Sequence, residues 1–276
     1  MNPLFLCGPG RSGTTIVTDI IGTHAELSPI YDIGFVASMC LNLNDETWYS
    51  NLKTLVEQWC ASPRLVLAND GDVFKHGRRH ILFEDGYAID SAAVAQQKIM
   101  ASKYIPLAYN EMLTSLFDRH ALNDNKPYWI SKTPAHTQFL PELLNIFPNM
   151  KIISCIRDGR DVTSSFMNFN TQMNFSGEPQ LWVSYIESIR AFQENNPTQC
   201  MEIKYEDFIA NTEQVLNSIF EWIGVEQSAA TVLDVYGREN IKSSSIGKYK
   251  TIFTPEQIAY FNSIAGQKLQ ELGYEL

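Results

Sequence analysis

The first residues able to do chemistry form a glycine-rich loop near the start of the chain, GPGRSGTT at residues 8–15. Its spacing fits the phosphate-binding pattern G-x-x-x-x-G-K-[ST], except that Thr14 replaces the lysine. Backbone N–H groups from Ser12 to Thr15 would face an anion at the start of a helix, and Arg11 adds a positive charge. Because the lysine that serves β- and γ-phosphates is absent, the loop predicts a ligand with a single phosphate here. An ordinary glycine turn is the alternative interpretation.

Three further segments place cations or hydroxyls where a strand or a loop ends. Arg157 and Ser165 lie in IRDGRDVTSSF (156–166), about two helical turns apart, so both could face one ligand. Lys132 lies in SKTP (131–134), and the segment KSSSIGKYKTIFT (242–254) is rich in lysine and hydroxyl groups. Taken singly, these are explained equally well by a charged surface cluster, a solvated lysine and an exposed loop.

Together and in this order, the four segments resemble those of the sulfotransferases that depend on 3′-phosphoadenylyl sulfate (PAPS). The family's loop [KR]-S-G-T-T, which holds the 5′-phosphosulfate, matches Arg11, Ser12, Gly13, Thr14 and Thr15. The pattern R-x-x-x-D-x-x-x-S, which supplies an arginine and a serine to the 3′-phosphate, matches Arg157, Asp161 and Ser165. The tyrosine of a Y-E-D motif, which lies near the adenine, matches Tyr205.

A late basic loop of the family, R-K-G-x-x-G-x-W-K-x-x-F-T, closes over the 3′-phosphate. In this chain a lysine replaces its arginine, two serines replace Lys-Gly, and Tyr249 replaces its tryptophan. The resemblance implies that the 3′-phosphate contacts come from Lys242, Ser243, Ser244, Ser245 and Lys248, with Lys250 as a further candidate.

The resemblance implies in-line transfer of a sulfuryl group from PAPS to a hydroxyl or amine, with charge building on the leaving oxygen. We expect Arg11 and Lys132 to stabilise that charge. Aryl and steroid members place a histidine base two residues after the lysine, but Pro134 occupies that position here. Tyrosylprotein-type members use a glutamate shortly after the first helix, which corresponds to Asp32. We therefore predict Asp32 as the general base, with His136 as the alternative.

The elements that must position these residues alternate along the chain. Short apolar runs at 4–7, 128–133, 151–157 and 200–206 predict buried strands, and segments with helical spacing follow them. This order predicts an α/β fold, a mainly parallel sheet flanked by helices on both faces. The resemblance implies a P-loop-like three-layer sulfotransferase architecture.

We expect a single domain, 1–276. Within it, residues 34–125 are aromatic-rich and are expected to form a variable helical region that binds the acceptor. The acceptor pocket is expected to be built from residues 30–105 and from residues 168–179, which are expected to form a lid.

Composition and charge limit the classes of molecule that the protein is expected to bind. The chain has 276 residues and a net charge of -10, which argues against nucleic acid or an anionic membrane as partner. No apolar run approaches membrane-spanning length and no signal peptide is recognisable, so we expect a cytoplasmic enzyme whose acceptor is a small metabolite.

The cysteines and histidines do not predict a disulfide or a metal site. The five cysteines are scattered along the chain, which fits reduced thiols. His76 and His80 have metal-pair spacing but lack a third ligand nearby, so no metal is expected. The oligomeric state is left open.

Two other functions are compatible with the loop. A nucleotide kinase would need a lysine at position 14 and a carboxylate for Mg²⁺, and Thr14 counts against it. A non-catalytic nucleotide-binding module would have no use for a strand-end lysine, and Lys132 is present.

Overall fold

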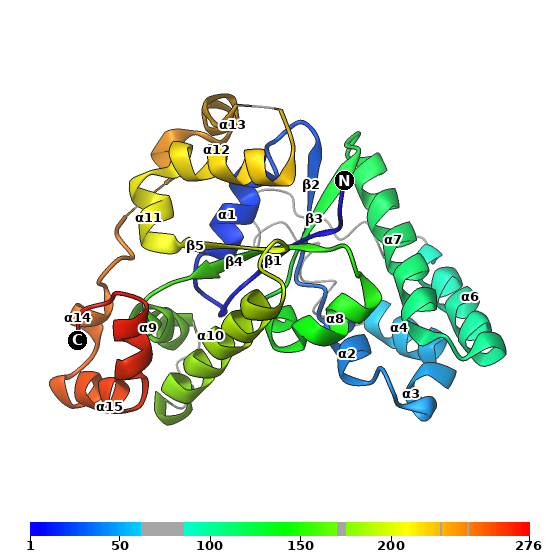
Figure 1. The fold of residues 1–276 in the computed structure, drawn as a ribbon, viewed down its shortest axis with the longest axis horizontal. Helices are drawn as coiled ribbons and strands as arrows, with labels where there is room; N and C mark the ends of the chain where they lie inside the picture. The colour runs from blue at the N-terminus through cyan, green and yellow to red at the C-terminus, as the bar shows by residue number, and fades with distance from the viewer. Residues whose placement is uncertain (62–85, 170–174, 227, 242) are drawn as a thin grey trace.

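Five parallel strands form one sheet at the centre of the computed structural model, which describes residues 1–61, 86–169, 175–226, 228–241 and 243–276 (Figure 1). The strands are β1 (Leu4–Cys7), β2 (Leu27–Tyr31), β3 (Tyr128–Lys132), β4 (Lys151–Ile156) and β5 (Cys200–Lys204). Their order is β2-β3-β1-β4-β5, so the shortest strand, β1, lies in the middle. All four residues of β1 are buried because helices cover both faces of the sheet.

One face of the sheet carries the helices drawn above it in Figure 1. They are α1 (Thr14–Ile21), α11 (Tyr205–Ala210), α12 (Thr212–Ile223) and α13 (Ala229–Tyr236). Leu4 and Leu6 of β1 point into this layer and pack with apolar residues of α1 and α12. Gly224 ends α12 in the left-handed conformation, as the glycine after an apolar helical run predicts.

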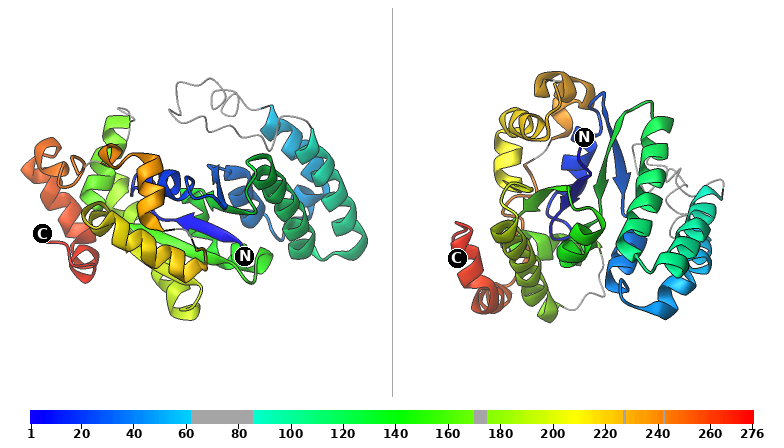
Figure 2. Two further views of the ribbon diagram at one scale, coloured as in Figure 1. Left: turned by 90° about the horizontal axis from the view of Figure 1, so that it is seen from above. Right: turned by 45° about the vertical axis from the view of Figure 1, so that its right-hand side comes forward.

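The opposite face receives Phe5 and Cys7, the alternate residues of β1. Its helices are α2 (Gly34–Leu41), α3 (Glu46–Ser50), α4 (Leu52–Cys60), α6 (Tyr87–Ser102), α7 (Ile105–Asn123) and α8 (Leu140–Ile146). The described part of residues 34–125 is therefore helical. Figure 2 shows α6 and α7 at one end of the molecule, and α7 packs on the edge strand β2.

A third group of helices lies at the other end of the sheet. It comprises α9 (Gly159–Phe169), α10 (Glu178–Asn195), α14 (Tyr249–Ile252) and α15 (Pro255–Glu271). Val162 of α9, Trp182 of α10 and Phe261 of α15 share a small apolar core. Thr254 and Gln257 form the reciprocal hydrogen bonds of a capping box at the start of α15.

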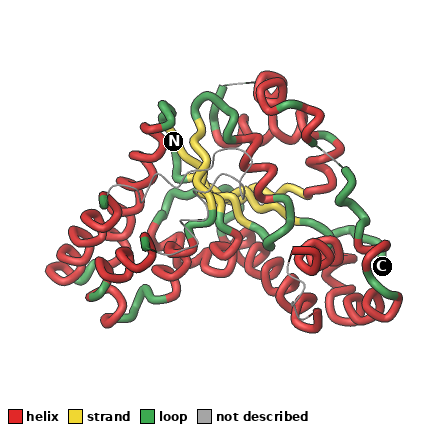
Figure 3. Tube along the Cα trace, turned by 180° about the vertical axis from the view of Figure 1, so that it is seen from behind, coloured by secondary structure: helices red, strands yellow, loops and turns green. Residues whose placement is uncertain are grey.

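The predicted fold class is confirmed: helices surround a wholly parallel sheet, as the view from behind shows (Figure 3). The four predicted strands are present, and β2 is an additional strand that the sequence did not predict. None of the described helices is both long enough and apolar enough to cross a membrane.

Candidate active site

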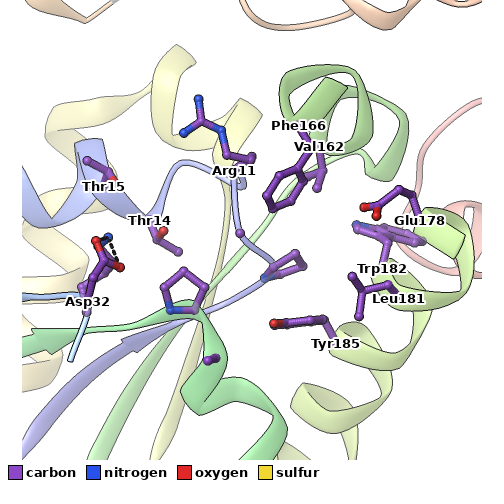
Figure 4. A pocket seen from close by; sticks show the side chains of 15 residues that line it. Arg11, Thr14, Thr15, Asp32, Val162, Phe166, Glu178, Leu181, Trp182 and Tyr185 are labelled. Atoms are coloured by element: carbon purple, nitrogen blue, oxygen red, sulfur yellow. Dashed lines mark hydrogen bonds and ion pairs between the residues drawn. The ribbon is translucent and has the colours of Figure 1, made fainter. Parts of the chain in front are cut away.

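A cavity of about 640 Å³ opens at the carboxyl ends of β1 and β3 (Figure 4). The chain leaves β1 toward α1 on one face, whereas it leaves β3 toward α8 on the other face. Such a divergence of connections creates a crevice, the usual ligand site of open α/β sheets. The lining residues are Pro9, Gly10, Arg11, Thr14, Thr15, Asp32, Lys132, Pro134, Ala135, Val162, Phe166, Glu178, Leu181, Trp182 and Tyr185.

The glycine loop connects β1 to α1 and forms one wall of this cavity. Gly13 caps α1 with φ 91°, and a Cβ atom there would lie 2.2 Å from a ring carbon of Tyr205. Only glycine fits this conformation and this close approach. The first N–H groups of α1 have no acceptor within the helix, and Thr14 and Thr15 place their side chains at the cavity. The loop therefore presents backbone donors and hydroxyls to an anion.

Ser12 plays a different part from the one we expected. Its N–H and its hydroxyl both donate to the carbonyl oxygen of Pro9, at 3.1 and 2.6 Å, and the residue is fully buried. Its own carbonyl accepts the Cys155 thiol at 2.9 Å. Ser12 thus closes the loop on itself and fixes it to β4, while the cavity is lined by its neighbours.

Lys132 and Asp32 meet at the ends of adjacent strands. In the β2–β3 register Tyr31 pairs with Lys132, and the next N–H, of Asp32, donates to the Lys132 carbonyl at 2.7 Å. The Lys132 ammonium lies 2.9 Å from both Asp32 carboxylate oxygens. The Lys132 side chain is 3% exposed and that of Asp32 is 46% exposed. The carboxylate therefore supplies the counter-charge of a buried ammonium while one side of it stays open to the cavity.

Arg11, Arg157 and Ser165 also come together, from the loop, the end of β4 and α9. Arg11 Nε donates to the Ser165 hydroxyl at 3.0 Å, and Arg157 donates to the Arg11 carbonyl at 3.0 Å. Burial, and then the nearby charge of Arg157, lower the pKa of Arg11. Two cations held side by side favour binding of an anion between or beside them.

The segment after residue 242 covers these cations. Arg157 donates to the Ser245 carbonyl, and the Ser245 hydroxyl lies 2.8 Å from the Tyr205 hydroxyl. The Arg157 guanidinium stacks on the Tyr205 ring, 4.8 Å from its centroid. Ser243, Ser244 and Lys248 are exposed, and Lys242 lies outside the described residues.

His136, the alternative base, is fully buried in the 3₁₀ helix that follows β3 (Pro134–Phe139). Its ring packs edge-on to Phe5, and neither ring nitrogen has a hydrogen-bond partner among the described residues. Burial lowers its pKa to about 4. The His136 side chain faces the core beneath the sheet and does not line the cavity, whereas Asp32 does.

The far wall of the cavity was predicted only in part, since Glu178 alone among its residues lies in the expected segment 168–179. It is built by Phe166 of α9 with Glu178, Leu181, Trp182 and Tyr185 of α10. We expected residues 34–125 to bind the acceptor, but of residues 34–61 and 86–125, which the structure describes, none lines this cavity. Of the predicted lid, 170–174 lie outside the described residues, and Glu178 belongs to the wall. An amphipathic helix gives no local signal that its apolar face lines a cavity.

The sequence as a whole matches the sulfotransferase family over residues 3–229. The chain therefore belongs to the sulfotransferase family, which confirms the predicted resemblance. Among curated proteins, a candidate protein-tyrosine sulfotransferase of Caenorhabditis briggsae is 29% identical over 127 residues, 44% of this chain and 45% of that protein. One from Caenorhabditis elegans is 26% identical over 177 residues, 60% of this chain and 68% of that protein. The match thus spans under half of the first relative's length.

Solved structures share the fold. The sulfotransferase domain of the olefin synthase from Synechococcus PCC 7002 superposes with a TM-score of 0.60, at 16% identity, over 100% of this chain and 96% of that domain. A mouse sulfotransferase in complex with PAP, adenosine 3′,5′-bisphosphate, gives a TM-score of 0.54 at 12% identity, covering 97% of this chain and 84% of that one. These likenesses show the three-layer sulfotransferase fold.

Metal ligands do not cluster in the part of the chain that the structure describes: it contains no group of three or more histidine, cysteine, aspartate or glutamate side chains placed to hold an ion. His76 and His80 lie outside that part.

Proposed function

We propose that this chain transfers a sulfuryl group from PAPS to a hydroxyl or amine of a small acceptor. The observation that carries the proposal is the convergence of Arg11, Lys132 and Asp32 on one cavity at the carboxyl ends of the strands. These residues supply two cations and a proton acceptor, which are what in-line transfer to a weak nucleophile requires.

The residues around the glycine loop fit such a donor. A 5′-phosphosulfate fits the donors of the loop and Thr14, and Arg157 stands beside the loop as a cation for the 3′-phosphate. The buried Nε of Arg157 has no partner among the described residues, so this guanidinium retains a donor for a ligand. Tyr205 and Ser245 contact this guanidinium, and Ser165 contacts that of the neighbouring Arg11. Together they complete the proposed nucleotide site.

When bound, PAPS supplies the sulfuryl group, whose bond to the bridging phosphate oxygen breaks as the bond to the acceptor forms. We assign Asp32 as the base that takes the acceptor proton on a carboxylate oxygen. Lys132 and Arg11 balance the charge on the departing oxygen. Because the Lys132 ammonium contacts both oxygens of Asp32, it can serve the leaving group only by sharing or leaving that carboxylate. The two roles are therefore coupled.

Two variants separate chemistry from binding. In Lys132→Ala and Asp32→Asn, we expect turnover of labelled sulfate from PAPS to fall by about 100-fold or more, the range for lost acid–base or charge stabilisation. Affinity for PAP, measured by calorimetry, should change much less, because the loop and Arg157 remain. Lys53→Ala, at an exposed position of α4, serves as the control.

Thermal shift tests the donor directly. We expect PAP without Mg²⁺ to stabilise the wild-type protein. Stabilisation by ATP with Mg²⁺ alone would favour the nucleotide kinase, and PAP binding with no transfer to any acceptor in a broad screen would favour a non-catalytic module. The cytoplasm is the location that this proposal assumes.

A further inference from the structure

The far wall of the cavity combines aromatic rings with one carboxylate. Figure 4 shows Asp32 on one side and the α10 residues Glu178, Trp182 and Tyr185 on the other, with the Tyr185 hydroxyl directed across the cavity. An acceptor whose reacting group meets Asp32 must therefore place its remote end against this wall.

The aromatic side chains of the wall are held rigidly. The Trp182 indole N–H donates to the Arg157 carbonyl at 3.1 Å, and its ring lies where a Cβ on Gly159 would come within 2.5 Å. Phe166 similarly lies over Gly10, where a Cβ would come within 2.7 Å of the ring. The glycines give the rings room to pack directly on backbone, so these faces are fixed before an acceptor binds.

Glu178 is the one charged residue on this side of the cavity among the described lining residues. The other three, Arg11, Asp32 and Lys132, belong to the glycine loop and the strand ends, where Lys132 and Asp32 neutralise each other. The Glu178 side chain makes no hydrogen bond or ion pair with any described residue, and neither does the Tyr185 hydroxyl. Partial burial raises the pKa of Glu178, and burial followed by the Glu178 charge raises the pKa of Tyr185. The carboxylate has thus lost water without gaining a partner from the described chain.

We propose that Glu178 and the rings beside it select an acceptor that carries a cationic group, such as an ammonium, remote from its reacting hydroxyl. This inference rests on the proposed function, since it assigns the far wall to the acceptor. A cation would pair with the Glu178 carboxylate while it contacts the rings of Phe166 and Tyr185, a combination that proteins use to bind ammonium groups. Trp182, which is 2% exposed, supports the wall from within the core. The net charge of -10 also favours the approach of a cationic molecule over an anionic one.

Phenols that differ in the charge of their remote group test whether the site prefers a cation. The cationic phenol and its neutral isostere have the same shape. The cationic probe is 4-(2-trimethylammonioethyl)phenol, which has no amine to accept sulfate, and its neutral isostere is 4-(3,3-dimethylbutyl)phenol. The anionic probe is 3-(4-hydroxyphenyl)propionate. Binding of each to the protein saturated with PAP is measured by calorimetry, and kcat/KM for sulfate transfer from PAPS gives a second readout.

We expect the cationic probe to bind at least about tenfold more tightly than the isostere, and the anion to bind most weakly. Glu178→Gln should remove most of this preference while leaving the dissociation constant of the neutral phenol unchanged. Glu187→Gln, an exposed position on the same helix, should keep the preference. Retained stabilisation by PAP verifies that each variant is folded.

The possible outcomes distinguish a failure of the proposed function from a failure of the inference about Glu178. If PAP does not bind the wild-type protein, the proposed function fails. If PAP binds but the cationic probe binds no better than its isostere, or not measurably, the inference about Glu178 is overturned while the proposed function stands. A preference that survives in Glu178→Gln would likewise overturn it.

Discussion

Two residues that line the cavity have backbone conformations that few residues adopt. Asp32 has φ 50° and Arg11 has φ 67°, both in the left-handed region that non-glycine residues rarely enter. Neighbouring strands hold them there: the Asp32 N–H bonds to the Lys132 carbonyl, and the Arg11 carbonyl accepts from Arg157. Strain of this kind persists where surrounding structure over-determines it, which is common in active sites. At the scale of single residues, the sheet therefore dictates where the carboxylate and the cation point.

Gly13 allows a prediction at this scale. Gly13→Ala must adopt φ 91° and also place a methyl group against the Tyr205 ring. We expect it to lower the free energy of unfolding by about 1–2 kcal/mol for the left-handed conformation and by about 1–3 kcal/mol more for the clash. Chemical denaturation measures both.

Gly224→Ala is the matched control for this prediction. Gly224 has φ 84°, but a Cβ there meets no atom within 4 Å. It should therefore show only the conformational part of the loss. Equal losses in the two variants would mean that the contact between Gly13 and Tyr205 does not constrain the loop.

At the scale of elements, Asp161 joins α9 to the segment that precedes α14. Its two carboxylate oxygens accept the N–H groups of Gly247 and Tyr249 at 2.7 and 3.0 Å, and Arg157 lies 3.7 Å away. The aspartate of the R-x-x-x-D-x-x-x-S pattern thus organises the cover of the proposed nucleotide site. The pattern predicted the arginine and serine as ligands, but not this bridging part for the residue between them.

Asp161→Asn tests that part. The amide keeps one acceptor oxygen but directs an NH₂ group at the other N–H, and it removes the counter-charge of buried Arg157. We expect a loss of about 3 kcal/mol in the free energy of unfolding. Amide hydrogen exchange at Gly247 and Tyr249 should become at least about tenfold faster, because local opening now breaks fewer bonds. With Asp207→Asn, at an exposed position of α11, both quantities should stay at wild-type values; unchanged exchange in Asp161→Asn would show that the segment is held by other contacts.

The strands show which elements of the fold could be predicted from the sequence. The apolar runs of β1, β3 and β4 identified strands that are largely buried, because strands covered on both faces need no alternation. The run at β5 was also identified as a strand, although this edge strand is only partly buried. Strand β2 was not predicted because Ser28 and Pro29 interrupt the apolar run in its sequence, LSPIY. Proline is tolerated there because β2 is an edge strand, a fact that only the strand order reveals.

At the scale of the whole molecule, the proposed nucleotide site could be predicted from the sequence more fully than the proposed acceptor wall. The loop, Lys132 and Arg157 follow strand ends, so their meeting at one edge follows from a parallel sheet. The prediction that Asp32 belongs to the site came from the family resemblance. The proposed acceptor wall depends on how α10 packs against the start of α9, where Trp182 contacts the Arg157 carbonyl and Gly159, and no local pattern encodes that packing.

Stability of the whole molecule should depend on pH through its buried histidines. Burial lowers the pKa of His136 to about 4, and burial together with Lys126 lowers that of His24 to about 4. The His24 Nδ1 accepts the Glu26 N–H at 3.0 Å, a bond that protonation would break. Both rings are thus neutral in the folded protein at pH values where an unfolded histidine, with a pKa near 6.5, begins to bind a proton.

The sign of the effect follows from this difference. Below about pH 6.5 these histidines bind protons in the unfolded chain, whereas in the folded protein they stay neutral until about pH 4. The free energy of unfolding therefore falls as the pH drops through this window. Each histidine contributes a slope of up to about 1.4 kcal/mol per pH unit. In His136→Leu, whose side chain suits the apolar contact with Phe5, the loss between pH 7 and pH 5 should shrink by about 2 kcal/mol, while the difference between pH 8 and pH 7 stays as in wild type. Urea denaturation at these three pH values measures this, and an identical pH 7 to 5 loss in both proteins would mean that His136 is protonated in the folded state as readily as in the unfolded one.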